Sequence, residues 1–158
     1  LGSRVTIVDY KDQFALTHRG HSIFAAHLVP VDHFATDFVS VAESFLGIPY
    51  FWGGKTSLGL DCSGLVQMAL DAVGKSAPRD SDMQEQQLGR LIATDPSQIA
   101  LQRGDLIFWK GHVGIMRDAT TLLHASGHHM LVVSEPLNEA VTRIAAKGAG
   151  SVTAIKRI

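Results

Sequence analysis

The chain has 158 residues, which is enough for one folded domain and a fragment of a second. Hydrophobic residues make up 46% of the sequence and charged residues 18%, values that are typical of a globular protein and exclude wholesale disorder. The formal net charge of -1 gives no electrostatic basis for binding nucleic acid or an anionic membrane surface, and no apolar run approaches the ~18 residues of a membrane span.

The first thirty residues are predicted to be β-rich. "RVTIVDY" (4–10) and "HSIFAAHLV" (21–29) are short runs of β-branched and aromatic residues, too few for an independent sheet. Pro30 to Asp32 is interpreted as a junction, so we expect domain boundaries at 1–30 and 31–158. Because Leu1 rather than Met begins the chain, without a charged and then apolar leader, we interpret the chain as a fragment whose targeting signal lies outside it.

Two helices are predicted in the next part of the chain. Apolar residues from Phe34 to Leu46 recur at helical spacing, with Asp32 as the expected N-cap and Gly47 as the expected stop. A glycine-rich, aromatic loop, "PYFWGGKTSLGL" (49–60), follows. A second apolar stripe then runs from Cys62 to Val73.

The remaining chain is predicted to be mainly β. A short helix is expected in "SDMQEQQLG" (81–89), within an otherwise polar and irregular stretch. After Gly104, the apolar runs are "DLIFW", "HVGIM", "TLLHAS", "MLVVSE" and "SVTAIKRI". Helices followed by hairpins predict an α+β fold, with the helices on one side of an antiparallel sheet.

Cys62 is the only cysteine, so it cannot form a disulfide within the chain. A lone cysteine is more often a buried apolar residue than a nucleophile. Cys62, however, occupies the first turn of its predicted helix, where free N–H groups and the helix dipole lower the pKa of a thiol. Asp61 is expected to cap this helix, which is an alternative to a role in binding.

A nucleophilic cysteine needs a base, and the base needs a group that orients it. Of the eight histidines, His112 and His124 lie in apolar β runs, whereas most of the others are expected at the surface. A hairpin turning at residues 117–119 places His112 directly opposite His124, and a one-residue slip would put them on opposite faces. His124 and His128 have a metal-ligand spacing only if they are helical, so we predict no metal site.

Several motifs together resemble the NlpC-type bacterial cell-wall cysteine peptidases. They are "PYFWGG", "DCSGLVQ", "PRDSDMQ", "RGDLIFW", "HVGIM" and "LLHAS", in the order and spacing of that family over residues 34–158. The resemblance implies a papain-like α+β fold with N-terminal helices packed on a central antiparallel sheet. Residues 1–30, through "FAAHLVPVD" (24–32), resemble the C-terminal remnant of a bacterial SH3-type barrel.

The resemblance also implies roles for individual residues. Cys62 corresponds to the nucleophile, His112 to the general base and His124 to the group that orients the base. Tyr50 corresponds to a tyrosine whose hydroxyl lies near the oxyanion. Other positions correspond to residues that line the substrate groove in members requiring a free N-terminal L-Ala: Asp61, Ser63 and Ser81.

The predicted function is hydrolysis of the γ-D-Glu–L-diamino acid bond in peptidoglycan stem peptides, without a metal or cofactor. Alternatives on the same scaffold are a muramoyl-L-alanine amidase and an acyl transferase; a non-catalytic cell-wall-binding module is a more distant alternative. The resemblance to members that recognise a free amine favours a cytoplasmic bacterial enzyme of peptide recycling over a secreted or periplasmic wall hydrolase.

Overall fold

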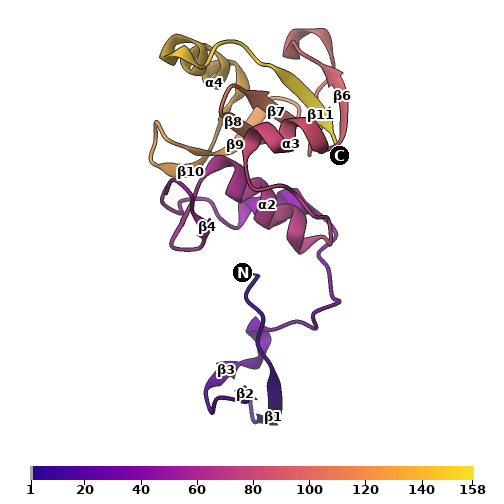
Figure 1. The fold of residues 1–158 in the computed structure, drawn as a ribbon, viewed down its shortest axis with the longest axis vertical. Coiled ribbons are helices and arrows are strands. Elements are labelled where there is room, and N and C mark those ends of the chain that lie inside the picture. Colours follow the sequence, from indigo (N-terminus) through magenta and orange to yellow (C-terminus); the bar gives the residue numbers. More distant parts are fainter. Residues whose placement is uncertain (1) are drawn as a thin grey trace. The chain divides into compact units, whose positions relative to one another are not determined.

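The computed structural model describes residues 2–158, which form two compact units that we treat separately (Figure 1). The first unit ends at Phe34 and the second runs from Ala35 to Ile158, so the division falls a few residues after the predicted junction. No helix among the described residues has the length and apolar character needed to cross a membrane.

The first unit is a three-stranded antiparallel sheet in the order β1-β2-β3. Its strands are β1 (Ile7–Lys11), β2 (Phe14–Thr17) and β3 (Ser22–Phe24), followed by a short 3-10 helix, η1 (Ala25–His27). The strand β2 was not predicted from the sequence. Lys11 pairs with Phe14, so Asp12 and Gln13 form a two-residue hairpin loop, in which Asp12 adopts a left-handed φ of 54°.

The second unit has four α-helices, two further short helical turns and eight strands among the described residues. The helices are α1 (Phe38–Glu43), α2 (Cys62–Ala72), α3 (Ser81–Gln87) and α4 (Leu137–Ile144), with η2 (Pro96–Gln98) and η3 (Ala145–Ala149). The strands are β4 (Lys55–Thr56), β5 (Gly59–Leu60), β6 (Arg90–Ala93), β7 (Leu106–Trp109), β8 (His112–Met116), β9 (Thr121–Ser126), β10 (Leu131–Pro136) and β11 (Ala154–Arg157).

Six of these strands form one antiparallel sheet in the order β10-β9-β8-β7-β11-β6, with a hydrophobic core on each face. Successive residues of a strand point to opposite faces. Leu106 and Phe108 therefore pack in the core that includes residues of α1 and α2, whereas Ile107 and Trp109 pack in the core that includes residues of α4. Figure 1 accordingly shows α2 and α4 on opposite sides of the strands.

The structure corrects two helix predictions. Asp37, and not Asp32, is the N-cap of α1, because its side chain accepts a hydrogen bond of 2.9 Å from the N–H of Val39. The helix α4 was not predicted, and it covers the face opposite α1 and α2, so the expectation of helices on one side only is wrong. The second and third helices, by contrast, begin at Cys62 and Ser81, where they were expected.

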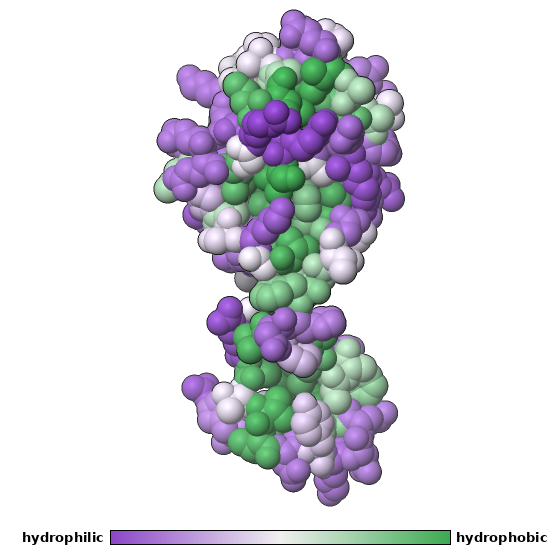
Figure 2. Space-filling model, turned by 90° about the vertical axis from the view of Figure 1, so that its right-hand side faces the viewer, coloured by the Kyte–Doolittle hydropathy of each residue, from purple (hydrophilic) through white to green (hydrophobic). Residues whose placement is uncertain are grey.

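The surface of the second unit mixes polar and charged residues with patches of hydrophobic ones (Figure 2). The most exposed large hydrophobic side chains of this unit include Trp52 and Leu58, both in the glycine-rich loop that precedes α2. The predicted loop is thus an exposed segment, interrupted by the short strand pair β4 and β5.

Candidate active site

Cys62 is the first residue of α2 and is 8% exposed. Asp61 caps the helix, because its Oδ1 accepts a hydrogen bond of 2.7 Å from the N–H of Gly64. Gly64 is required by packing, since a side chain there would collide with the carbonyl oxygen of Gly54. The glycines of the "DCSG" segment and its preceding loop therefore let two backbones meet closely beside the thiol.

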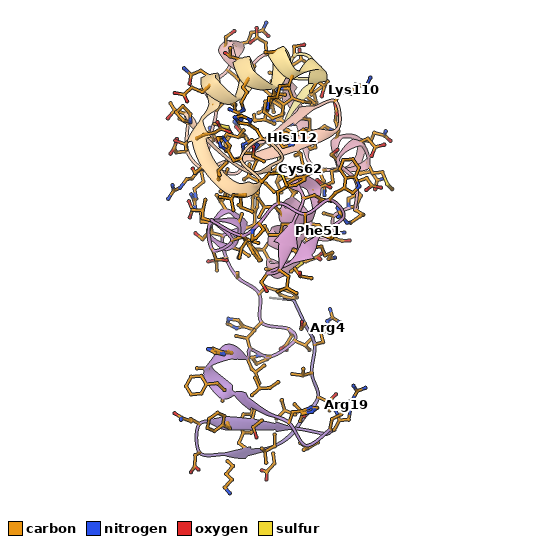
Figure 3. The ribbon with its side chains drawn as sticks, turned by 90° about the vertical axis from the view of Figure 1, so that its left-hand side faces the viewer. Arg4, Arg19, Phe51, Cys62, Lys110 and His112 are labelled. Atoms are coloured by element: carbon orange, nitrogen blue, oxygen red, sulfur yellow. The ribbon has the colours of Figure 1, made fainter. Side chains whose placement is uncertain are left out.

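His112 is the first residue of β8, which packs against α2. It pairs with Trp109 across the tight β7–β8 turn, and the two ring centroids lie 5.7 Å apart. The next residue, Val113, offers its backbone N–H to the Cys62 sulfur. The thiol and the imidazole thus come from the starts of two packed elements, α2 and β8, as Figure 3 shows.

His112 and His124 are in direct contact: His112 Nε2 lies 2.7 Å from His124 Nδ1, and the rings meet edge to face. The predicted register is wrong by two residues, because Ile115 pairs with Leu123, and this places the turn one residue later. A shift by two residues keeps both histidines on one face of the sheet, since side chains alternate with a period of two. The predicted sharing of one face is therefore confirmed.

The contact chain continues beyond the predicted residues. His124 Nε2 lies 2.6 Å from Oε1 of Glu135 on β10. Arg143, in the last turn of α4, binds both carboxylate oxygens of Glu135 at 2.6 and 2.5 Å. The sequence analysis missed both residues. Glu135 had a signal, as an acidic residue in the apolar run "MLVVSE", but Arg143 lies on the helix that was not predicted.

Burial controls the protonation of the central groups. It raises the pKa of the Cys62 thiol, although the N–H of Val113 acts in the opposite direction. Burial, with the nearby His124 and Arg143, lowers the pKa of His112 to about 3. The expectation that the helix start lowers the pKa of the thiol is therefore wrong here, because desolvation outweighs the helix N–H groups. At neutral pH, thiol and imidazole are both uncharged.

Tyr50 packs against the core that includes Cys62. Its N–H donates to the carbonyl of Met130 at 2.9 Å, and its backbone forms a bridge with that of Leu60, just before the start of α2. Burial raises the pKa of the Tyr50 hydroxyl, and the charges of Cys62 and Asp61 act in the same direction. The phenol is thus within electrostatic reach of the thiol, in its protonated, hydrogen-donating form.

The Asp61 carboxylate is fully engaged within the protein. Arg79 binds both its oxygens, at 2.9 Å to Oδ1 and 2.6 Å to Oδ2, and also contacts the Ser63 hydroxyl at 3.0 Å. The N–H of Gly53 donates to Oδ2 at 2.8 Å. Burial alone would raise the pKa of Asp61, but the hydrogen bonds from Arg79 and from the N–H of Gly64 outweigh it and lower this pKa. Sequence reasoning missed Arg79, although it lies within the quoted motif "PRDSDMQ".

Ser81 is half-buried at the first position of α3. This helix is tied to the start of α2 by the Gln84 side-chain amide, which donates to the carbonyl of Ser63 at 2.9 Å. Ser81 thus shares a helix with a residue that contacts the "DCSG" segment. Among residues 2–158, no cluster of three or more histidine, cysteine, aspartate or glutamate side chains has the geometry of a metal site.

Comparison with known proteins places this arrangement in a family. The NlpC/P60 family matches residues 47–147, which is more than half of the chain and includes Cys62, His112 and His124. The chain belongs to the NlpC/P60 family. This assignment confirms the resemblance to NlpC-type cysteine peptidases that the sequence motifs carried.

Curated relatives of this NlpC/P60 domain are longer proteins. It is 38% identical over 106 residues to dipeptidyl-peptidase 6 of Lysinibacillus sphaericus, a match that covers 67% of this chain and 38% of that protein. It is 35% identical over 99 residues to the γ-D-glutamyl-L-lysine dipeptidyl-peptidase of Bacillus subtilis, covering 58% of this chain and 32% of that protein. The matched region therefore spans only about a third of the length of each of these relatives.

Solved structures show the same fold. An NlpC/P60 family protein from Bacillus cereus superposes with a TM-score of 0.70 at 23% identity, covering 98% of this chain and 53% of that chain. The peptidoglycan hydrolase RipB from Mycobacterium tuberculosis superposes with a TM-score of 0.60 at 32% identity, covering 77% of this chain and 62% of that chain. These matches confirm the predicted α+β fold of the NlpC/P60 type.

Proposed function

We propose that the protein is a cysteine endopeptidase that hydrolyses the γ-D-Glu–L-diamino acid bond of peptidoglycan stem peptides. The observation that carries this proposal is the pairing of His112 with His124 at 2.7 Å, beside a cysteine at the start of α2, in a domain of the NlpC/P60 family. An arrangement of thiol, imidazole and orienting group is what acyl transfer through a covalent intermediate requires.

The chemistry begins with two neutral groups. The Cys62 sulfur attacks the γ-carbonyl of D-Glu while its proton passes to the ring nitrogen of His112 that does not face His124. The backbone N–H of Cys62 and the Tyr50 hydroxyl donate to the developing oxyanion. His112 then gives the proton to the leaving amine, and water, deprotonated by the same imidazole, releases the acyl group from sulfur.

The choice of bond is supported by the relatives. The Bacillus subtilis relative is named a γ-D-glutamyl-L-lysine dipeptidyl-peptidase, and a peptidase of that name removes a dipeptide from a free N-terminus. We extend this preference to the present chain and propose peptides that begin with a free L-Ala, as released during cytoplasmic wall recycling. In this proposal Asp61, Ser63 and Ser81 contact the substrate amine.

The geometry at Asp61 sets a condition on this part of the proposal. Both carboxylate oxygens are already bound by Arg79, so a substrate ammonium must share the carboxylate with the guanidinium. The Arg79 side chain remains partly exposed, at 31%, and so leaves access to the pair from solvent. The preference for a substrate with a free N-terminal amine is therefore tested in a separate experiment from the identity of the bond that is hydrolysed.

The experiment is mass spectrometry of L-Ala-γ-D-Glu-L-Lys peptides after incubation with the purified protein, with Cys62→Ala as the control. We expect release of the dipeptide L-Ala-D-Glu and of the diamino acid fragment, and none with the variant. Release of a free amine on L-Ala from a muramoyl peptide would instead identify an amidase. Transfer of the acyl group to an added amine would identify an acyl transferase. Intact peptides of both kinds would favour a binding module.

A further inference from the structure

The hydrogen-bond chain at the active site ends in an ion pair that the mechanism above does not use. We propose that Glu135, held by Arg143, is a positioning residue that fixes which nitrogen of each histidine carries the proton and so leaves His112 ready to accept the proton of Cys62. The inference rests on the proposed function, because it assigns a role to residues behind the proposed base.

The positions of the protons follow from what each group can donate. An ionised carboxylate only accepts hydrogen bonds, so His124 Nε2, 2.6 Å from Glu135 Oε1, must carry a hydrogen. A neutral imidazole has one N–H, and therefore His124 Nδ1 is an acceptor. It faces His112 Nε2 at 2.7 Å, which must in turn be the donor. The other nitrogen of His112, Nδ1, is left with a free lone pair.

This arrangement of protons requires neutral histidines and an ionised Glu135, and the surroundings provide both. Burial lowers the pKa of His112 and of His124. Burial alone would raise the pKa of Glu135, but the hydrogen bonds from His124 and Arg143 hold it well below its usual value. One further titratable side chain faces Glu135: Nε2 of His129 lies 3.6 Å from Glu135 Oε2.

Arg143 makes the carboxylate both charged and fixed in orientation. Its two terminal nitrogens each bind a different oxygen of Glu135, a two-pronged geometry that lysine cannot reproduce. The pair is largely buried, with side-chain exposures of 19% for Arg143 and 11% for Glu135. The helix α4, absent from the predicted fold, thereby reaches the active site through Arg143.

Loss of the carboxylate would permit the opposite proton arrangement. In Glu135→Gln the amide N–H₂ can donate to His124 Nε2, so that His124 Nδ1 carries the hydrogen and donates to His112 Nε2. His112 Nδ1 then holds its own hydrogen and cannot accept one from the thiol. We expect kcat to fall about 10- to 100-fold, the usual cost of removing a group that orients a functional side chain, with KM little changed.

The test compares Glu135→Gln with Glu43→Gln. Glu43 is a matched control, because its carboxylate is likewise bound by arginine, in this case Arg103 and Arg117, and no histidine is among its hydrogen-bond partners. Nitrogen-15 NMR of histidine-labelled protein reads each tautomer directly, and steady-state kinetics separates kcat from KM. We expect Nε2–H on both His112 and His124 in the unmodified protein, Nδ1–H in part of the Glu135→Gln molecules, and no change in Glu43→Gln.

Nδ1–H on His112 in the unmodified protein would overturn the inference, as would Glu135→Gln with unaltered tautomers and kcat. If Glu135→Gln does not fold, the tautomers of the unmodified protein and the kcat of Arg143→Lys decide instead, and a kcat of Arg143→Lys equal to that of the unmodified protein would count against it. Absence of any peptide hydrolysis by the unmodified protein would contradict the proposed function, while the NMR measurement would still decide the tautomers.

Discussion

Gly114 lies against the side chain of His124: a β-carbon at position 114 would come 3.3 Å from the β-carbon of His124. It would also come 2.7 Å from Cδ1 of Leu122, a fully buried residue. Strand β8 thus leaves out a side chain at the point where β9 presents His124, the proposed orienting histidine. The "HVGIM" motif therefore combines the proposed base, His112, with the space that His124 needs.

Replacement of Gly114 by alanine is expected to destabilise the domain by about 1–3 kcal/mol, the usual cost of overpacking a core. Chemical denaturation measures this change. Gly127→Ala is the matched control, because a β-carbon there meets only Tyr50, at 3.8 Å, an ordinary contact. Equal stability of the two variants would show that Leu122 and His124 can move aside with no loss in the free energy of unfolding.

The site was predictable to the extent that short motifs carry it. Asp61 caps α2 as expected, and His112 and His124 share a face although the register was wrong by two residues. The error came from the turn, which lies one residue later than predicted, where Asp118 Oδ1 accepts hydrogen bonds from the N–H groups of Thr120 and Thr121. Because the register error is an even number of residues, His112 and His124 still lie on the same face of the sheet, as predicted.

The remaining part of the site depends on tertiary contacts that the sequence pattern did not reveal. Glu135 and Arg143 are eight residues apart, but they meet only because α4 folds back over the sheet. The pKa of Cys62 depends on burial beneath other elements, which the helix position alone did not indicate. The partner of Asp61, Arg79, likewise comes from a segment that was expected to be irregular.

Cys62→Ala is expected to abolish hydrolysis while costing only about 1 kcal/mol of stability, since a single buried heavy atom is removed. Its side chain packs in the core shared by α2 and the sheet, so some loss is expected. Kinetics and denaturation of the same preparation give both values. Peptide hydrolysis that persists in purified Cys62→Ala would rule out the cysteine as nucleophile.

The pH dependence of kcat/KM should be that of a site in which both the thiol and the imidazole are neutral. His112 must be unprotonated to accept the thiol proton, and burial lowers its pKa from 6.5 to about 3, so kcat/KM should stay high well below pH 6.5. The raised pKa of Cys62 places the alkaline limb above the usual range of a thiol. A pH–rate profile measures both limbs. An acid limb at or above pH 6.5 would indicate a thiolate–imidazolium pair instead.

Stability should fall in acid for the same reason. Below pH 6.5 the unfolded chain protonates His112 and His124, whereas burial keeps both neutral in the folded protein. The unfolded state then binds more protons, so the free energy of unfolding should fall as the pH falls, by ~1.4 kcal/mol per pH unit from His112, and the lowered pKa of His124 adds in the same direction. Urea denaturation over this range measures the slope. His112→Gln should make it shallower, and an unchanged slope would contradict the assigned burial effect.

The last prediction concerns which peptides are accepted. A substrate ammonium that shares the Asp61 carboxylate with Arg79 gains a charge-assisted contact of about 1.5–3 kcal/mol, or one to two decades in kcat/KM. N-acetylation of L-Ala-γ-D-Glu-L-Lys should therefore lower kcat/KM by at least this factor. Asp61→Asn keeps a residue that caps helices well, and it should slow hydrolysis of the free peptide but not of the acetylated one. Equal rates for the two peptides with the unmodified protein would defeat the recycling proposal and favour a hydrolase of intact wall.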